Sequence, residues 1–547
     1  MDSILDPRRR RFLLPSRVVW TSKSGIEGAQ NLLSDDHTSC IFKTGAGGAV
    51  LLDFGQEMHG GVRIDVTSGS AARPIHVRVR FGESVSEAMA EPNNDHAIHD
   101  WDMKVSWFGR TDVGDTGFRF VRIDLTDPDA TLVIKNVHAV SLAYDEPYLG
   151  TFKCSDQRLN RIWEVGAQTV HLCMQDHLWD GIKRDRLVWL GDMHPETMVV
   201  TSLFGAHPIV PASLDKVRNE TPLPKSHVDG VNPFGGSPWM NGISSYSLWW
   251  IIIQRDWYRY HGDLIYLQEQ REYLTGLLDL VLTRIDDTGK ETLDSRFLEW
   301  PTSTDPTAID AGLQALTAIA LRAAAELCGV LGEMEAANRA AEAAARAERY
   351  MRPPSESKQA NALLALAGMA DAVDTNERIL AKDPDRRVST FYGYYVLQAR
   401  ALAGDYTGCL DLLRSFWGGM IDLGATTFWE DFNLEWTPNA TGIEELPVSG
   451  RPDIHADFGD FCYKGLRHSL CHGWAAGPTA WLMEHVLGVS PAAPGFSKVA
   501  IRPNLGGLTY ARGTFPTPHG IITVSHELQA DGTVKSDIML PEGVERV

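Results

Sequence analysis

The stretch DGIKRDRLVWLGD, residues 180–192, is the most informative part of this chain. It places three aspartates, two arginines and a tryptophan within thirteen residues. Asp180, Asp185 and Asp192 are five and seven positions apart, so they do not stack as helical neighbours, which are three or four positions apart. The segment therefore predicts a loop that crowds like charges.

Crowded carboxylates raise one another's pKa, which suits a site where one must donate a proton and others accept hydrogen bonds. Arg184 is a fixed cation that can hold a neighbouring carboxylate ionised, and Trp189 offers a flat apolar face. Acids beside an aromatic platform favour a sugar-cleaving site. The alternative is a solvated acidic loop in which Arg184 pairs locally.

The same stretch resembles the signature of the α-L-rhamnosidases of glycoside hydrolase family 78, whose usual form is D-x-x-x-R-[DE]-x-x-x-W-x-G-D. Every fixed position of that signature is filled, by Asp180, Arg184, Asp185, Trp189, Gly191 and Asp192.

The resemblance extends along nearly the whole chain. Upstream, the segments that resemble the family's β-sandwich are 51–64, 80–89 and 116–125. Downstream, the segments that resemble the end of its barrel and its closing β-domain are 426–432, 469–482 and 496–524. The resemblance implies a multidomain protein with a central all-α (α/α)6 barrel, flanked by an N-terminal antiparallel β-sandwich and a small C-terminal β-domain.

Composition sets the broad class. The chain has 547 residues, 44% of them hydrophobic, with 16 Trp and 19 Phe, which is ample for large cores and argues against disorder. Its net charge of −20 argues against nucleic acid or an anionic membrane as a partner. The resemblance implies small rhamnosylated glycosides or oligosaccharides as partners, and a homodimer is an option for which the sequence gives no warrant.

Seven scattered cysteines show no metal-ligand spacing and indicate reduced thiols. No run of 18 apolar residues predicts a transmembrane helix. The basic segment at residues 8–11 is followed by no apolar stretch long enough for an export signal. These observations predict a cytoplasmic protein.

Hydrophobic periodicity divides the chain into three parts. Alternating apolar and polar residues with turn signals predict strands from about residue 48 to residue 144, within an N-terminal domain of residues 1–147. Helical patterns dominate residues 148–488, the predicted barrel. Strand patterns return in residues 489–547, a segment too short to form a sandwich alone, which should pack on the barrel.

The signature should lie between two helices. Ser155 or Asp156 is a candidate cap for a helix ending near Asp176, and Pro195 suits the first turn of the next. Further helices are predicted at 306–329, 333–350, 358–370, 388–402 and 407–417, with long connections at 222–244, 285–305 and 424–468. In a barrel of helical hairpins such loops gather at one end, where function is usually built.

Inverting hydrolysis needs a carboxylic acid that protonates the leaving oxygen and a carboxylate about 6.5–9.5 Å away that activates water. Counted back from Trp189, the general acid of the resembled family falls on Asp185. Many members have glutamate at this position, so Asp180 and Asp192 stay open as alternatives. The segment TTFWEDF places the general base on Glu430 by the same resemblance.

Asp431 and Glu435 compete with Glu430 for the role of base, and a helix-capping role for Glu430 is a further alternative. His472 in SLCHGW matches a sugar-binding histidine of the family, although Cys471 replaces the asparagine that usually precedes it.

The resemblance also implies how the sugar is held. Asp180, Arg184 and Asp192 match ligands of the sugar hydroxyls. Rhamnose carries a methyl group where common hexoses carry a hydroxymethyl, so aromatic walls are expected, with Trp189, Trp239 and Trp300 as candidates. For Trp239 and Trp300 core packing is the competing role.

His455, Asp457 and Asp460 invite a metal interpretation, since mixed histidine and carboxylate ligands can hold zinc or calcium. Their spacing matches no defined motif, and we predict an active-site loop with no metal and no cofactor.

The sequence therefore predicts a glycoside hydrolase that removes terminal, non-reducing α-L-rhamnosyl residues by inversion, with Asp185 as acid and Glu430 as base. The rivals are another six-hairpin glycosidase acting on a different 6-deoxy or uronic sugar, and a non-catalytic sugar-binding homologue. The presence of every signature carboxylate argues against the second rival.

Overall fold

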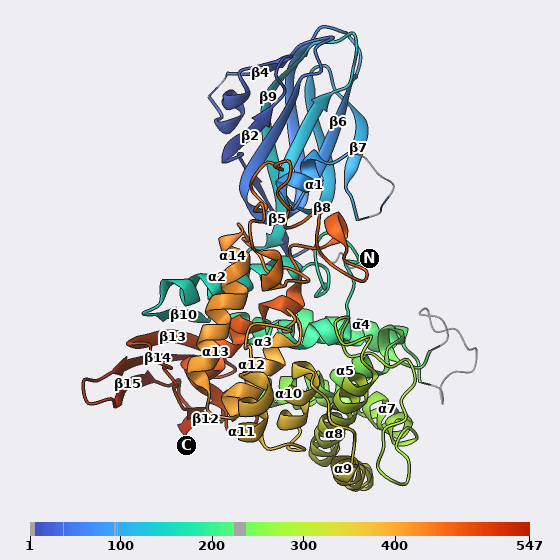
Figure 1. Ribbon diagram of the computed structural model, residues 1–547, viewed down its shortest axis with the longest axis vertical. Coiled ribbons are helices and arrows are strands. Elements are labelled where there is room, and N and C mark those ends of the chain that lie inside the picture. Colours follow the sequence, from blue (N-terminus) through green and yellow to red (C-terminus); the bar gives the residue numbers. More distant parts are fainter. Residues whose placement is uncertain (1–5, 37, 92–94, 96, 224–236) are drawn as a thin grey trace.

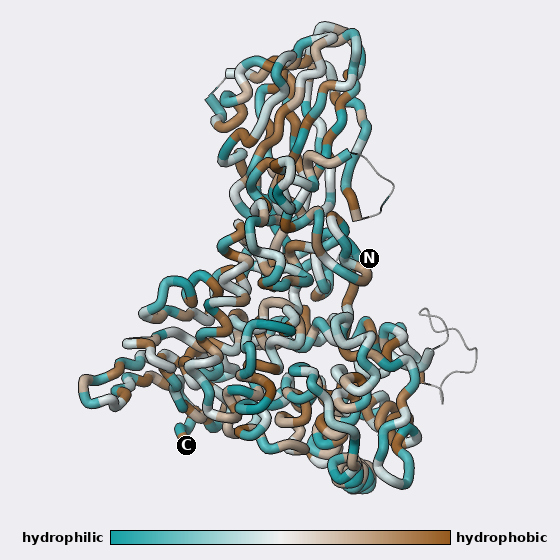
Figure 2. Tube along the Cα trace, viewed as in Figure 1, coloured by the Kyte–Doolittle hydropathy of each residue, from teal (hydrophilic) through white to brown (hydrophobic). Residues whose placement is uncertain are grey.

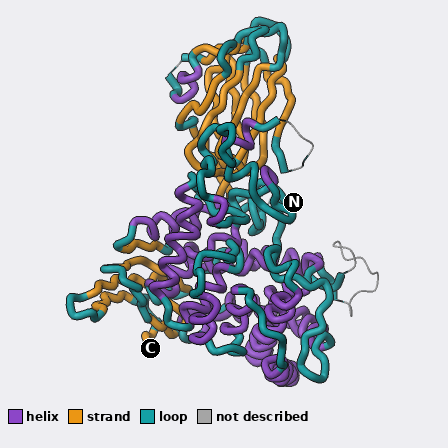
Figure 3. The backbone as a smooth tube through the Cα atoms, viewed as in Figure 1, coloured by secondary structure: helices purple, strands orange, loops and turns teal. Residues whose placement is uncertain are grey.

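The computed structural model describes residues 6–36, 38–91, 95, 97–223 and 237–547. It has an N-terminal sheet domain, a helical middle and a small C-terminal sheet domain (Figures 1 and 3). Most of the connection predicted at 222–244 lies outside the described residues.

The N-terminal domain is built on one nine-stranded antiparallel sheet. Its strands are β1 (Arg8–Leu13), β2 (Arg17–Thr21), β3 (Ile26–Glu27), β4 (Cys40–Phe42), β5 (Ala49–Gly69), β6 (Ile75–Gly82), β7 (Asp100–Val105), β8 (Gly109–Leu125) and β9 (Leu132–Tyr144). The long strand β5 pairs with β8 along most of its length, with β2 at its beginning and with β9 at its end. Alternating apolar side chains from these strands form a separate core, and hydrophobic stretches follow the strands in Figure 2.

The helical middle contains α2 (Gln157–Cys173), α3 (Leu190–Phe204), α4 (Ile209–Glu220), α5 (Ser244–His261), α6 (Leu264–Glu269), α7 (Arg271–Leu282), α8 (Pro306–Val330), α9 (Met334–Arg349), α10 (Lys358–Leu366), α11 (Ala372–Thr375), α12 (Gly393–Leu402), α13 (Tyr406–Leu412), α14 (Gly418–Asp422) and α15 (Gly477–Trp481). Contacts run from α3 to α5, α8, α10, α12 and α15 in turn, and α15 contacts α3 again. These six helices therefore form a continuous circuit.

The last part of the chain forms two small sheets. One contains β10 (Thr151–Cys154), β13 (Tyr510–Thr517), β14 (Gly520–Leu528) and β15 (Val534–Met539), and the other contains β11 (Val489–Pro491), β12 (Lys498–Ile501) and β16 (Glu545–Arg546). Strand β13 contacts α3, as expected for a sheet that packs on the helical part. β10 lies just before α2 in sequence, so the chain enters the helical part through the C-terminal sheet.

Two helices begin elsewhere than predicted. Helix α3 starts at Leu190, not at Pro195, so Asp192 lies in its first turn. The backbone N–H of Leu190 donates to the side-chain oxygen of Asn241 at 3.1 Å, a distant partner that satisfies the start of the helix. Helix α12 starts at Gly393, five residues after the predicted start.

Helix α8 is long and apolar enough to cross a membrane by length and composition alone. Within its most apolar window 67% of the residues are buried inside the protein, which is typical of a core helix.

Candidate active site

The candidate site is a cavity of about 510 Å³ at the amino-terminal ends of the helix circuit. It is lined by Asp180, Arg184, Asp185, Trp189, Asp192, Gly242, Ile243, Tyr246, Ser295, Arg296, Phe297, Trp300, Glu430, Cys462, Arg467, His472 and Trp474. The structure thus brings together eight of the nine side chains that the sequence predicts for the site.

The signature loop is held in one conformation by its own hydrogen bonds. The N–H of Asp180 donates to the carbonyl of Leu187 at 2.9 Å, and the N–H of Leu187 donates to Asp180 Oδ1 at 3.0 Å. Between them the backbone of Asp185 and Arg186 adopts positive φ angles of 48° and 53°. Non-glycine residues in this region are uncommon and concentrate at functional sites, which fits a loop shaped to aim particular side chains.

Arg184 joins the two predicted catalytic carboxylates. Its guanidinium is buried; Nη1 donates to Asp185 at 3.2 Å, and Nη2 donates to Glu430 in a close ion pair. Nε donates to the carbonyl oxygen of Arg467 at 3.0 Å. Burial alone would lower the pKa of Arg184, but Glu430 and Asp185 raise it, so the side chain is a permanent cation.

Glu430 is held as a buried carboxylate. Its Oε2 accepts from the N–H of Ser469 at 3.2 Å, and its main-chain carbonyl accepts from Trp474 Nε1 at 2.9 Å. Burial alone would raise the pKa of Glu430, but the nearby His472 and Arg184 lower it below its ordinary value. The ionised form, which a general base needs, is therefore the stable one.

Asp192 and His472 form a second polar pair. His472 Nε2 lies 3.1 Å from Asp192 Oδ1, and the Tyr246 hydroxyl donates to Asp192 Oδ2 at 3.3 Å. Burial tends to lower the pKa of His472, but Glu430 and Asp192 raise it.

The pKa values of two signature aspartates, Asp180 and Asp192, are raised, as expected, but crowding is not the main cause. The pKa of Asp180 is raised chiefly by burial and further by Asp185 and Asp192, while His472 opposes the rise. The pKa of Asp192 is likewise raised by burial. Burial, more than like charge, perturbs these two acids.

Aromatic rings form the apolar wall of the cavity. Trp189 meets Tyr246 edge-on, with ring centroids 6.0 Å apart, and Trp300 lies between Phe297 and Phe461 at 5.2 and 5.7 Å. Sequence reasoning missed Tyr246 and Phe297, since both look like ordinary core residues. Trp474 was also missed, although it follows His472 by two positions in the same matched segment.

Trp239, predicted to hold the sugar, is not among the described residues that line the cavity. Its side chain is fully buried, and its indole N–H donates to Asp294, so it belongs to the core. The two rivals of Glu430 are also elsewhere. Asp431 lines a different cavity, and Glu435 is exposed and pairs with Arg386 at 2.8 Å.

Lys183, inside the signature, ties the loop to the N-terminal domain. Its fully buried ammonium lies 3.1 Å from Glu87 and 3.6 Å from Glu83, and it donates to the carbonyl of His468 at 3.0 Å. Glu83 in turn accepts from the N–H of Leu470 at 2.7 Å. The sheet domain therefore supports both the signature loop and the segment before His472.

The histidine considered for a metal belongs to this same cluster. His455 Nδ1 bonds the Ser84 hydroxyl at 2.7 Å, and Nε2 bonds the carbonyl of His468 at 2.9 Å. Among the described residues, the acids that approach His455 closely enough to share an ion are Glu83 and Glu87, and not Asp457 and Asp460, which were considered in the sequence analysis. The Lys183 ammonium already supplies a positive charge among them.

Comparison with known families gives two matches. Residues 147–363 match the bacterial α-L-rhamnosidase six-hairpin glycosidase domain, and residues 488–547 match the bacterial α-L-rhamnosidase C-terminal domain. An α-L-rhamnosidase of Alteromonas sp. (strain LOR) is 36% identical over 117 residues, which are 21% of this chain and 10% of that protein. One of Streptomyces avermitilis is 29% identical over 119 residues, 22% of this chain and 10% of that protein. Each alignment thus spans about a tenth of the curated relative.

Solved structures resemble the whole fold. A family 78 rhamnosidase of Bacillus sp. GL1 matches with a TM-score of 0.74 and 23% identity, over 94% of this chain and 56% of that one. A rhamnosidase from Klebsiella oxytoca, solved with rhamnose bound, matches with a TM-score of 0.70 and 20% identity, over 87% of this chain and 96% of that one. At these identities the likeness establishes a shared fold.

The Lys183 cluster predicts a pH-dependent loss of stability on mutation. Lys183→Met leaves Glu83 and Glu87 buried without their cation, which should destabilise the protein by about 3–5 kcal/mol at pH 8. Burial raises the pKa of both carboxyl groups, while Lys183 opposes the rise. At pH 5 they can bind protons instead, so the loss should shrink. Urea unfolding at the two pH values measures both effects.

Exposed Lys464 provides the matched control, and Lys464→Met should leave stability within about 0.5 kcal/mol of the parent. Adding Glu87→Gln to Lys183→Met should recover much of the loss at pH 8. A Lys183→Met protein as stable as the parent at pH 8 would show that the cluster contributes nothing.

A second effect of pH on stability is predicted for the buried Glu299, which is next to Trp300 in the sequence. Its Oε1 has no hydrogen-bond partner among the described residues, and burial raises its pKa from 4.5 to about 8. A carboxyl group whose pKa is higher in the folded protein stabilises the fold fully at pH values below the pKa it has in the unfolded chain. This contribution is lost as the pH rises through the folded-state pKa of about 8. The Tm of the parent relative to Glu299→Gln should therefore fall between pH 6 and pH 9, as followed by calorimetry. A constant difference would contradict this assignment.

Proposed function

Because this chain belongs to the bacterial α-L-rhamnosidase family of six-hairpin glycosidases, we propose that it hydrolyses terminal α-L-rhamnosyl residues by an inverting, two-carboxylate mechanism. The observation that carries the proposal is the joint attachment of Asp185 and Glu430 to one guanidinium, that of Arg184, inside a cavity with an aromatic wall. A small rhamnosylated glycoside or oligosaccharide is the proposed substrate.

We propose that the six helices of the circuit close an (α/α)6 barrel. The unbroken series of contacts from α3 through α12 and α15 back to α3 supports closure. The proposed N-terminal β-sandwich is supported by β5, which runs through the domain and pairs with β2 at its beginning and with β9 at its end.

Glu430 is proposed as the general base. It is buried, its pKa is lowered, and Arg184 and the Ser469 N–H fix the orientation of its carboxylate. In an inverting reaction this carboxylate accepts a proton from the water that attacks the anomeric carbon. Both the charge state and the rigid placement support that role.

Asp185 is proposed as the general acid. Its side chain is 30% exposed beside the cavity, so a leaving group can reach it. The alternative acids line the same cavity but are buried, where Asp180 accepts from the N–H of Leu187, and Asp192 accepts from Tyr246 and contacts His472. Asp180 and Asp192 are therefore better suited to fix hydroxyl ligands than to deliver a proton.

The apolar wall suits a sugar with a methyl group. The rings of this wall belong to Trp189, Tyr246, Phe297 and Trp300. A methyl group can pack against them, whereas a hydroxyl group in its place would lack a hydrogen-bond partner. A uronic sugar would favour a cation free to bind its carboxylate, yet each arginine among the described lining residues is already paired. Arg296 pairs with Glu291 and Asp310, Arg467 pairs with Asp95, and Arg184 pairs with Asp185 and Glu430. The cavity therefore favours the 6-deoxy sugar over the uronic one.

A cytoplasmic location is also proposed. All seven cysteines are free, and six of them are buried, which suits a reducing compartment. Detection of the native protein outside the cytoplasm would contradict it.

The two carboxylates should respond differently to the leaving group. Asp185→Asn should lower kcat by about 10²–10⁴-fold on rhamnosides with poor leaving groups and far less on activated aryl rhamnosides, since only the former need a proton. Glu430→Gln should impair both substrates alike, because each requires activated water. Steady-state kinetics on an alkyl and a nitrophenyl rhamnoside measure the difference.

Asp431→Asn is the matched control, since Asp431 is adjacent to Glu430 but lines a different cavity, and it should retain most of the activity. If Asp185→Asn lowers kcat equally on both substrates, the role of general acid belongs to Asp180 or Asp192.

The preference among substrates should depend on whether the sugar carries a methyl or a hydroxymethyl group. L-Mannosides differ from L-rhamnosides by one hydroxyl at that position, and a hydrophobic slot should reduce their kcat/KM by about 10–200-fold. D-Mannosides present mirror-image hydroxyls to Asp180, Arg184 and Asp192 and should not be cleaved. A panel of nitrophenyl glycosides, with 6-deoxy and uronic sugars included, measures this order. Equal cleavage of D- and L-sugars would refute the proposed binding roles.

A further inference from the structure

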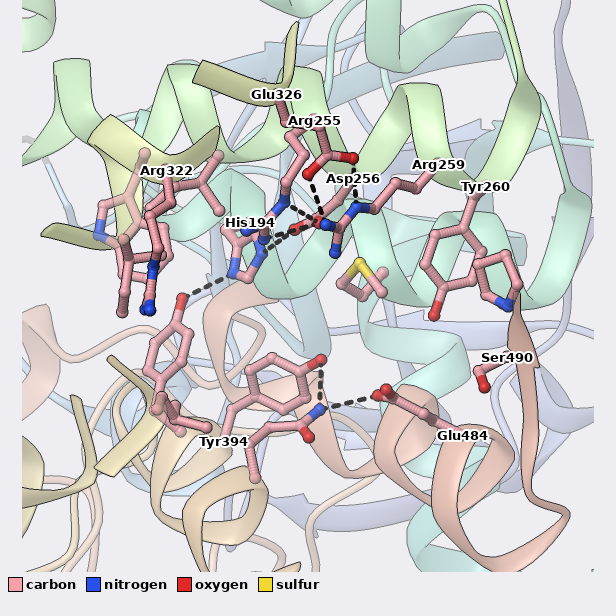
Figure 4. Close-up of a pocket in the computed structure, with 18 of the residues that line it drawn as sticks. His194, Arg255, Asp256, Arg259, Tyr260, Arg322, Glu326, Tyr394, Glu484 and Ser490 are labelled. Carbon is pink, nitrogen blue, oxygen red and sulfur yellow. Dashed lines mark hydrogen bonds and ion pairs between the residues drawn. The ribbon is translucent and has the colours of Figure 1, made fainter. Parts of the chain in front are cut away.

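A second cavity, of about 580 Å³, lies toward the carboxyl-terminal ends of the same helix circuit (Figure 4). Helices α3, α5, α8, α10 and α12 all contribute to it, together with Glu484 after α15 and Ser490 on β11. None of the described residues that line it also lines the candidate active site. Its volume falls within the range of about 300–1,000 Å³ that is usual for small-molecule sites.

Three rings that pack against one another form one side of this cavity, with Trp249 and Tyr395 centroids 4.9 Å apart. The imidazole of His194 lies parallel to Trp249 and Tyr395, at centroid distances of 4.8 and 5.7 Å. Its two ring nitrogens are engaged by the Tyr395 hydroxyl at 2.9 Å and by Asp256 at 3.1 Å. The side chain of His194 is therefore fixed, and the three rings together offer a rigid surface.

The polar side chains are fixed in pairs as well. Arg255 contacts Asp256 at 2.8 Å, and Arg259 Nε donates to Glu326 at 2.7 Å. Figure 4 shows these pairs on one side of the cavity.

On the other side the Gln398 amide donates to the Tyr394 hydroxyl at 3.0 Å and to Glu484 at 2.9 Å. Tyr260 and Ser490 add two hydroxyls to the lining and are labelled in the same view. Planar hydrogen-bonding groups thus surround the space before any ligand enters.

The charges that line the cavity balance. Among the described lining residues, three arginines oppose three carboxylates: Arg255, Arg259 and Arg322 against Asp256, Glu326 and Glu484. Arg322 is further neutralised by Glu348, 3.2 Å away. A phosphate or another anion would meet as many carboxylates as cations, so the cavity suits a neutral ligand.

We propose that this cavity is a second carbohydrate site, which binds a neutral mono- or disaccharide. Fixed guanidinium, carboxylate and amide groups can donate and accept at neighbouring hydroxyls with little loss of side-chain entropy. Aromatic rings provide the apolar faces that sugar C–H groups require. The inference does not depend on the proposed function, because no described residue lines both cavities.

Ser490→Trp tests the site by filling it from its half-buried rim, and exposed Ser497→Trp in the same region is the matched control. Tyr260→Phe removes one hydroxyl without adding bulk. Asp192→Asn alters only the candidate active site. Binding of L-rhamnose, maltose and inorganic phosphate to the full-length variants is measured by titration calorimetry, after circular dichroism has verified their folding.

At least one of the two sugars should bind with an affinity that Ser490→Trp lowers by at least tenfold and Tyr260→Phe by about 2–10-fold. Asp192→Asn and Ser497→Trp should leave this binding event unchanged. The inference is overturned if Ser490→Trp affects neither sugar, or if phosphate occupies the cavity in preference to both. Loss of sugar binding in Asp192→Asn alone would concern the proposed function and not this site.

Discussion

The buried guanidinium of Arg184 is the constraint on which the candidate site depends. It binds Asp185 from its own loop, Glu430 from a segment more than two hundred residues away, and the carbonyl of Arg467. Such a cation is tolerated in the interior only with partners that satisfy its charge and its N–H groups. The same bonds that satisfy Arg184 therefore fix the distance and orientation of the two carboxylates.

A neighbouring buried cation, Lys183, connects the signature loop to the N-terminal domain in the same way. Lys183 requires Glu83 and Glu87 from the sheet domain, just as Arg184 requires Glu430. Hydrogen bonds add to the junction: the N–H of Gly117 donates to the carbonyl of Ile182 at 2.9 Å. The signature loop is thus held from both sides, which explains how a loop with positive φ angles keeps a single shape. In this view the sheet domain is a structural part of the site.

Much of this arrangement could be predicted from sequence, for identifiable reasons. The signature is local, so Asp180, Arg184, Asp185 and Asp192 were expected together from their spacing and composition. Glu430 followed only from the family resemblance, because nothing in its spacing from Arg184 reveals that the two meet.

The features that could not be predicted from the sequence have physical causes too. Leu190 begins α3 because Asn241 caps it from another loop, a contact that local patterns do not encode. Tyr246 follows helical periodicity like a core residue, yet it lines the cavity. Trp239, a candidate for the cavity wall with core packing as its competing role, lies in the core. Periodicity identifies the inner face of a helix but not the stretch of that face which lines a cavity.

The most direct test of the proposed mechanism is the configuration of the sugar at the instant of release. Proton NMR can follow the anomeric signals of rhamnose during the first minutes of hydrolysis of an aryl α-L-rhamnoside. Direct attack by water activated at Glu430 predicts that β-L-rhamnose forms first and that the α anomer follows only by mutarotation. Initial release of α-L-rhamnose would contradict the inverting pair of Asp185 and Glu430, and failure to release rhamnose would contradict the proposed function itself.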